Sequence, residues 1–131
     1  MEKPIILKGK IVHGKALGRT VGMPTANLEI SEGVFPESGV YVTRIRIGEE
    51  ILESVTNIGM RPSVDCEKYT TVETHILNFD RDIYGEDVTL EVIKFLRPIQ
   101  KFDNLKEVQE QVRKDILRTK QYLKQYKEEY K

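Results

Sequence analysis

Residues 40–58 read VYVTRIRIGEEILESVTNI, and they predict a β-hairpin. Arg44 and Arg46 alternate with isoleucines, as expected of a strand that has one face in water. A compact Gly-Glu-Glu link then separates this run from a second β-type run. Similar runs, rich in Val, Ile, Thr or Tyr and bounded by Gly, Pro, Asp or Asn, lie at 7–13, 71–77 and 88–96.

The last third of the chain changes to a helical period. Asn104 and Glu107 resemble a capping box, which predicts a helix over about 104–125 with a frayed tail beyond Leu123. Strands followed by one helix, without β-α-β alternation, favour a small antiparallel barrel packed by a C-terminal helix. The apolar stripe of this helix consists of Leu105, Val108, Val112, Ile116, Thr119 and Leu123.

Composition limits the classes of function. A chain of 131 residues has the length of one domain, and its 21 basic and 21 acidic residues give zero net charge. Broad electrostatic attraction to nucleic acid or anionic membranes is therefore absent. Cys66 is the only cysteine, which excludes an intrachain disulfide. No window reads as a signal peptide or a membrane span, so we expect a cytoplasmic location by default.

Residues 14–27, GKALGRTVGMPTAN, carry the clearest functional pattern. Their glycines leave backbone N–H groups open to a phosphate, and Lys15 and Arg19 add positive charge. Thr25 and Asn27 face the same side if the segment is extended, so both oxygens could meet one hard cation. The stretch is neither a P-loop nor a dinucleotide fingerprint. From the residues alone, a tight loop between strands is the alternative.

Residues 71–85, TVETHILNFDRDIYG, place Glu73 and His75 on the same face of a stiff strand. Such a strand can hold a catalytic carboxylate, although a surface glutamate is the alternative. We interpret His75 as structural or site-lining, because no carboxylate spacing supports a zinc site.

Residues 95–103, FLRPIQKFD, join the last predicted strand to the helix. Structurally, they read as a proline turn in which Phe102 docks the helix onto the barrel. Functionally, they offer Arg97 and one aromatic ring to a planar ligand.

Together these segments resemble the riboflavin kinase family. The pattern Gly-x-x-x-Gly-Arg-x-x-Gly-x-Pro-Thr-Ala-Asn is similar to the opening motif of that family, and Glu-Thr-His-Ile followed by Asp and Tyr-Gly is similar to its second motif. Residues 57–63, NIGMRPS, match a further stretch, with Ser63 in place of the usual Thr, and Arg-Pro with Phe-Asp resembles the flavin-binding loop. The resemblance runs from about Gly9 to Leu123. It implies one domain, 1–131: a six-stranded antiparallel Greek-key barrel over about 7–98 with a long C-terminal helix packed against it.

The resemblance also implies an activity: transfer of the γ-phosphoryl group of ATP to the 5′-hydroxyl of riboflavin, giving FMN and ADP. Glu73 is then the catalytic base, and Thr25 and Asn27 hold Mg²⁺. Arg97 and Phe102 contact the flavin. We expect a monomer that binds riboflavin or FMN and ATP or ADP, but neither nucleic acid nor membrane. The implied ATP contacts are Gly14, Lys15, Gly18, Arg19, Thr25, Asn27, Ile76, Asn78 and Tyr84.

Three points stay open at this stage. Bacterial family members usually carry an N-terminal nucleotidylyltransferase domain that makes FAD, and we expect this chain to lack it, as a free-standing kinase or as a module of a longer protein. A catalytically silent flavin-binding or regulatory module on the same barrel is the main alternative. A small barrel that binds single-stranded nucleic acid would need a basic groove with interleaved aromatic residues, which zero net charge and the absence of Trp disfavour.

Overall fold

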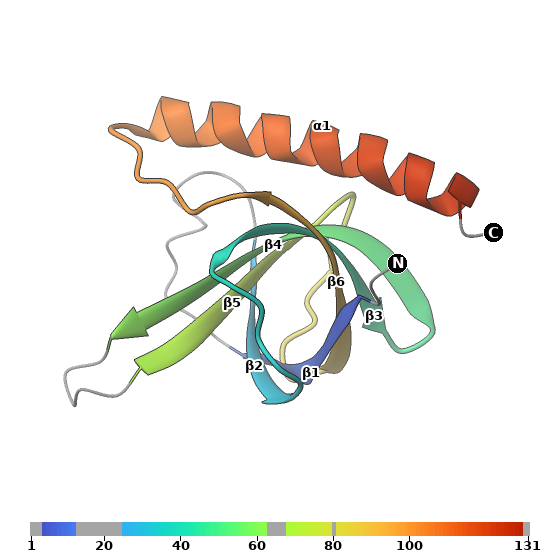
Figure 1. The fold of residues 1–131 in the computed structure, drawn as a ribbon. Coiled ribbons are helices and arrows are strands. Elements are labelled where there is room, and N and C mark those ends of the chain that lie inside the picture. The colour runs from blue at the N-terminus through green and yellow to red at the C-terminus, as the bar shows by residue number, and fades with distance from the viewer. Residues whose placement is uncertain (1–3, 13–24, 63–67, 80, 130–131) are drawn as a thin grey trace.

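Six antiparallel strands close into a barrel, and one helix packs against its outside, in the computed structural model (Figure 1). The structure describes residues 4–12, 25–62, 68–79 and 81–129. The order around the barrel is β1-β2-β5-β4-β3-β6, with β6 pairing back onto β1. The elements are β1 (Ile5–Val12), β2 (Ala26–Glu32), β3 (Gly39–Ile47), β4 (Glu50–Pro62), β5 (Lys68–Ile76), β6 (Asp87–Arg97) and α1 (Leu105–Glu129).

The connections confirm the Greek-key prediction. Strands β3, β4 and β5 follow one another as hairpins, and β6 returns to lie beside β3. The predicted hairpin at 40–58 is confirmed, because Ile47 pairs with Glu50 across a two-residue turn. Gly48 adopts a φ of +60° in this turn, a conformation that favours glycine.

Strand β2 is the element that pattern reasoning did not find. Its sequence, ANLEISE, contains Asn, Ser and two Glu, which are residues of low or modest strand propensity. Tertiary pairing outweighs that propensity, since β2 is hydrogen-bonded to β1 on one side and to β5 on the other. The only sequence signal for β2 is a weak apolar alternation. It consists of Ala26, Leu28 and Ile30, which all pack on the core.

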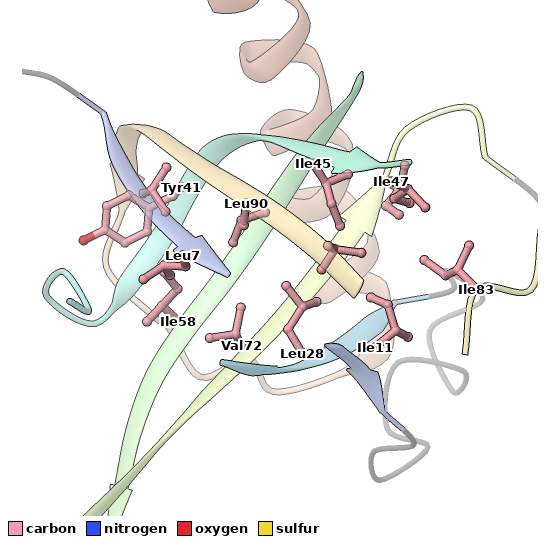
Figure 2. Packing of buried hydrophobic residues seen from close by; sticks show 13 residues of the cluster. Leu7, Ile11, Leu28, Tyr41, Ile45, Ile47, Ile58, Val72, Ile83 and Leu90 are labelled. Carbon is pink, nitrogen blue, oxygen red and sulfur yellow. The ribbon is translucent and has the colours of Figure 1, made fainter. Parts of the chain in front are cut away.

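The barrel interior is filled by side chains from every strand, as Figure 2 shows for thirteen residues of the cluster. Alternate positions point inward, so the residues between them face outward. The members with no or almost no exposure include Leu7, Ile45, Ile58, Val72 and Leu90.

A chain of buried hydroxyl groups crosses this interior. Thr43 Oγ1 lies 2.7 Å from Ser54 Oγ and 2.8 Å from Thr56 Oγ1, and Thr56 Oγ1 lies 2.9 Å from Thr74 Oγ1. All four side chains are fully buried. The chain therefore links β3, β4 and β5 by bonds that a slipped register would leave unsatisfied.

Helix α1 lies across the outer face of β3, β4 and β6 (Figure 1). A small cluster of Val40, Val42, Leu96 and Leu123 holds it there. The predicted cap is confirmed, because the Glu107 N–H donates to Asn104 Oδ1 at 2.9 Å.

The prediction of a frayed tail beyond Leu123 is wrong, since the helix continues to Glu129. Aromatic contacts stabilise the added turns: Tyr122 stacks on Tyr126, and the Arg44 guanidinium lies 5.0 Å from the centre of the Tyr126 ring. Among the described residues, no helix is both long enough and apolar enough to cross a membrane.

Thr56→Val tests the hydroxyl chain. Valine has nearly the volume of threonine but removes the central hydroxyl, so buried groups on β3 and β5 lose a partner. We expect the free energy of unfolding, measured by urea denaturation, to fall by about 1–3 kcal/mol. Thr89→Val, at a half-buried outward position of β6, is the control and should change it by less than about 0.5 kcal/mol. Equal effects of the two substitutions would contradict the role given to the chain.

Candidate active site

Glu73 lies between two asparagines in one row across three strands. In the sheet register it is the direct partner of Asn27 on β2 and of Asn57 on β4. Its neighbours Val72 and Thr74 are buried in the barrel, so all three members of the row face outward. Glu73 and Asn27 are half-buried, and Asn57 is exposed. Directly paired positions have Cβ atoms about 5 Å apart, which is the reach of side chains that share one ligand.

Thr25 joins this row from the start of β2. It immediately precedes the strand, is half-buried, and lies two residues before Asn27. Hydroxyl, amide and carboxylate oxygens from Thr25, Asn27 and Glu73 form a donor set that suits a hard divalent cation such as Mg²⁺. Among the residues that the structure describes, no group of three or more His, Cys, Asp or Glu could hold a metal ion.

The two described residues that flank the glycine-rich segment lie at this row. Strand β1 ends at Val12, which is the register partner of Asn27, and the described chain resumes at Thr25. Gly14, Lys15, Gly18 and Arg19 lie outside the described residues, as do Ser63 and Cys66, so their expected roles stay predictions.

The other expected nucleotide contacts are divided between the core and the surface. Ile76 is buried in the core cluster at the end of β5. Asn78 is exposed in the turn that follows, with a positive φ of 53°, which asparagine tolerates better than most residues. Tyr84 is exposed, and its N–H donates to Asp82 Oδ1 at 3.0 Å. His75 faces outward on β5, two residues after Glu73.

Arg97 is the last residue of β6, and Phe102 lies in the loop at 98–104 that joins β6 to α1. The Arg97 guanidinium is 5.9 Å from the centre of the Phe102 ring. It also forms an ion pair with Asp115 of α1, with Nη2 2.8 Å from Oδ2. The structure therefore brings the two expected flavin contacts together and gives Arg97 a partner within the protein.

This loop reaches the outer face that carries Glu73. A Cβ built on Gly59 would lie 3.3 Å from Ile99 Cδ1, so Ile99 of the loop packs over β4 at this glycine. Gly59 is two residues beyond Asn57 and pairs with Thr71, whose hydroxyl donates to the Gly59 carbonyl at 3.1 Å. Ile99 of the loop therefore lies over β4 two residues beyond Asn57, next to the row of Asn27, Glu73 and Asn57.

Tyr41 lies near the same end of the barrel, since its neighbour Val40 pairs with Asn57. Its hydroxyl donates to the Glu37 carbonyl at 2.6 Å, and its ring meets Phe95 edge-on at 5.5 Å. Burial raises the pKa of Tyr41, and the Glu37 carboxylate raises it further. Tyr41 is therefore a neutral hydrogen-bond donor at neutral pH.

The sequence patterns did not predict two residues of this region, Asn57 and Asp115. Asn57 lies within a stretch that resembled the family, but only the register reveals that it borders Glu73. Asp115 is buried on α1, and its spacing from Val112 and Thr119 is the signal that could have revealed it. Steps of three and four place this charged residue on the apolar face of the helix.

Comparison with known proteins identifies the family. The sequence profile of the flavokinase family, described as riboflavin kinase, matches residues 1–123. The chain is 37% identical to a bifunctional riboflavin kinase/FMN adenylyltransferase from Escherichia coli K12, over 91% of this chain and 38% of that protein. It is 36% identical to the RNA-binding riboflavin kinase RibR from Bacillus subtilis, over 85% of this chain and 48% of that protein. The chain thus spans less than half the length of these relatives.

Two solved structures share the fold. A crystal structure described as a macrolide-efflux protein from Streptococcus pneumoniae superposes with a TM-score of 0.85 at 33% identity, over 89% of this chain and 38% of that one. Riboflavin kinase from Trypanosoma brucei superposes with a TM-score of 0.64 at 22% identity, over 94% of this chain and 82% of that one. The profile match covers nearly the whole chain and agrees with the curated relatives. The chain belongs to the riboflavin kinase (flavokinase) family.

Proposed function

We propose that this chain transfers the γ-phosphoryl group of ATP to the ribityl 5′-hydroxyl of riboflavin, giving FMN and ADP. The observation that carries the proposal is the row in which Glu73 lies between Asn27 and Asn57. A carboxylate on a rigid strand, beside oxygen donors for a cation and next to a loop with exposed apolar side chains, supplies the parts that phosphoryl transfer to an alcohol requires.

Glu73 is the general base in this proposal. It accepts the proton of the 5′-hydroxyl as that oxygen attacks the γ-phosphorus; the new O–P bond forms while the bond to the β-phosphate oxygen breaks, and ADP leaves. A positioned base contributes about 10²–10⁴ in rate. Glu73 is half-buried, so its carboxylate remains accessible to a substrate.

The β2 side of the row serves the nucleotide. Thr25 and Asn27 hold Mg²⁺, which neutralises charge on the phosphates when it is bound. Residues 13–24 connect Val12 to Thr25 in the sequence, and we propose Gly14, Lys15, Gly18 and Arg19 of this segment as contacts to the ATP phosphates. Asn78 and Tyr84, both exposed, are proposed as further contacts to the nucleotide.

The β4 side serves the flavin. Ile99 is an exposed apolar side chain that packs over Gly59 on the outer face of β4. A flat, largely apolar ring system can bury such side chains, and Phe102 adds an aromatic surface. The attacking hydroxyl then approaches Glu73 from β4 while the phosphate approaches from β2. We further propose that the chain acts as a monomer in the cytoplasm.

Glu73→Gln tests the base. With Mg²⁺, ATP and riboflavin, the unsubstituted protein should form FMN detectable by chromatography. The variant should still bind both substrates while kcat falls by about 10²–10⁴, the usual contribution of a general base. Glu29→Gln, an exposed outward position of β2, is the matched control and should retain kcat.

Near-full activity of Glu73→Gln would remove Glu73 from the mechanism. Tight FMN binding without any ATP-dependent synthesis by the unsubstituted protein would favour a silent flavin-binding module instead.

Asn27→Ala and Asn57→Ala separate the two sides of the row. Loss of the Asn27 oxygen should raise the Mg²⁺ concentration that gives half-maximal rate by roughly tenfold, because a cation loses one of its few protein ligands. Asn57→Ala should lower kcat without moving that concentration. The measurement is FMN formation over a Mg²⁺ titration at saturating riboflavin. Equal shifts in the two variants would mean that the cation does not lie on the β2 side.

A further inference from the structure

The ion pair between Arg97 and Asp115 is the most buried one that the described residues form. The Arg97 side chain is 14% exposed and that of Asp115 only 3%. Arg97 Nε donates to Asp115 Oδ1 at 2.9 Å and Nη2 donates to Oδ2 at 2.8 Å, so the ion pair is bidentate. Gln111, one helical turn earlier, donates to the same Oδ1 at 3.0 Å. Both oxygens of the Asp115 carboxylate therefore accept hydrogen bonds, and these bonds fix its orientation.

The same guanidinium holds the strand–helix loop. Arg97 Nη1 donates to the carbonyl of Pro98 at 3.2 Å, and the Phe102 ring lies against the guanidinium. Residues 98–104 run from the end of β6 to the start of α1, where Figure 1 shows them bridging barrel and helix. Arg97 thus contacts Pro98 at the start of the loop and Phe102 near its end, while Asp115 anchors Arg97 to the helix.

Stability alone does not explain this arrangement. Removing two charges from water is costly, and apolar residues of similar volume often stabilise a protein as well as a buried ion pair does. An apolar pair, however, would have no directional bonds to the Pro98 carbonyl or to a fixed point on α1. What the charged pair adds is a defined loop geometry.

That geometry matters because of where the loop lies. Ile99 packs over Gly59, which is one step along the sheet from Asn57 and Glu73. A shift of the loop would therefore move the apolar surface proposed for the flavin relative to the proposed base. Displacement of about 1 Å, even by a change remote from the chemistry, can lower a rate by about 10²-fold.

We propose that Asp115 is a positioning residue for the flavin: it fixes Arg97, and through Arg97 the loop at 98–104, against β4 beside Glu73. This inference rests on the proposed function for its ligand. It assigns Asp115, from the middle of the helix, a role in recognition of one substrate and not of the other.

Asp115→Asn is the test, because it keeps Arg97 and the side-chain shape but removes the charge. We expect kcat/KM for riboflavin to fall by roughly 10- to 100-fold, the range for a misplaced site, while KM for ATP stays within about twofold. Hydrogen exchange at the amides of residues 99–104 should accelerate in the same variant. Glu91→Gln is the matched control, since Glu91 pairs with Arg44 on the same outer face and is 27% exposed. This control should change neither kcat/KM for riboflavin nor hydrogen exchange at the amides of residues 99–104.

A second variant separates positioning from folding. Arg97→Met/Asp115→Leu replaces the pair by apolar residues and should keep Tm near that of the unsubstituted protein while loop exchange accelerates as in Asp115→Asn. The proposal is overturned if Asp115→Asn impairs kcat/KM for riboflavin and KM for ATP to a similar degree. It is also overturned if hydrogen exchange at the amides of residues 99–104 is unchanged in both variants. If the unsubstituted protein forms no FMN, the proposed function fails. The exchange measurement then still decides whether Asp115 fixes the loop, and riboflavin titration decides whether that loop binds flavin.

Discussion

The register of β5 between β2 and β4 is the constraint on which the rest of the site depends. Side chains alternate along a strand, so a slip of one residue would turn Glu73 into the barrel and turn both Val72 and Thr74 outward. Two interactions prevent this slip: the apolar core holds Val72 and Ile76 inside, and the hydroxyl chain from Ser54 to Thr74 fixes β5 against β4 and β3. Interior packing thereby determines the spacing of a row that lies entirely on the outer face.

The barrel also brings together segments that are distant in the chain. Asn27 and Glu73 are neighbours only because β2 pairs with β5 across the Greek-key connection, and Ile99 reaches Gly59 only because β6 lies beside β3. Rigid strands carry Glu73 and the two asparagines beside it. The residues proposed to contact ATP and the flavin, such as Asn78, Tyr84 and Phe102, lie in loops. This division is physically sensible, since a base needs a fixed position and ligands must enter and leave.

The sequence was sufficient for the elements with strong local patterns. The hairpin at 40–58 and the Asn104 cap were predicted because alternation and capping are local properties, and the family motifs predicted the barrel. Strand β2 was missed because its pairing partners, rather than its own residues, make it a strand. The row was not predictable in the same way: Glu73 and Asn27 were each named, but no local pattern encodes that they pair or that Asn57 completes the row. Asp115 was missed because a charged residue within an apolar stripe looks like solvated surface until its partner is known.

The helix is attached differently from the strands, and this bears on how the site works. The barrel is held by a large apolar cluster, whereas α1 rests on the four-residue cluster around Leu123 and on polar contacts such as Arg97–Asp115 and Arg118 with the Leu96 carbonyl. The pairing that places Glu73 beside Asn27 on β2 involves no residue of α1, whereas α1 packs on β4, the strand that carries Asn57. The loop at 98–104, in contrast, ends on the helix and takes its position from it. A change in the seating of α1 would alter the flavin side of the site and leave Glu73 and Asn27 in place, so the two substrates depend on separable parts of one small domain.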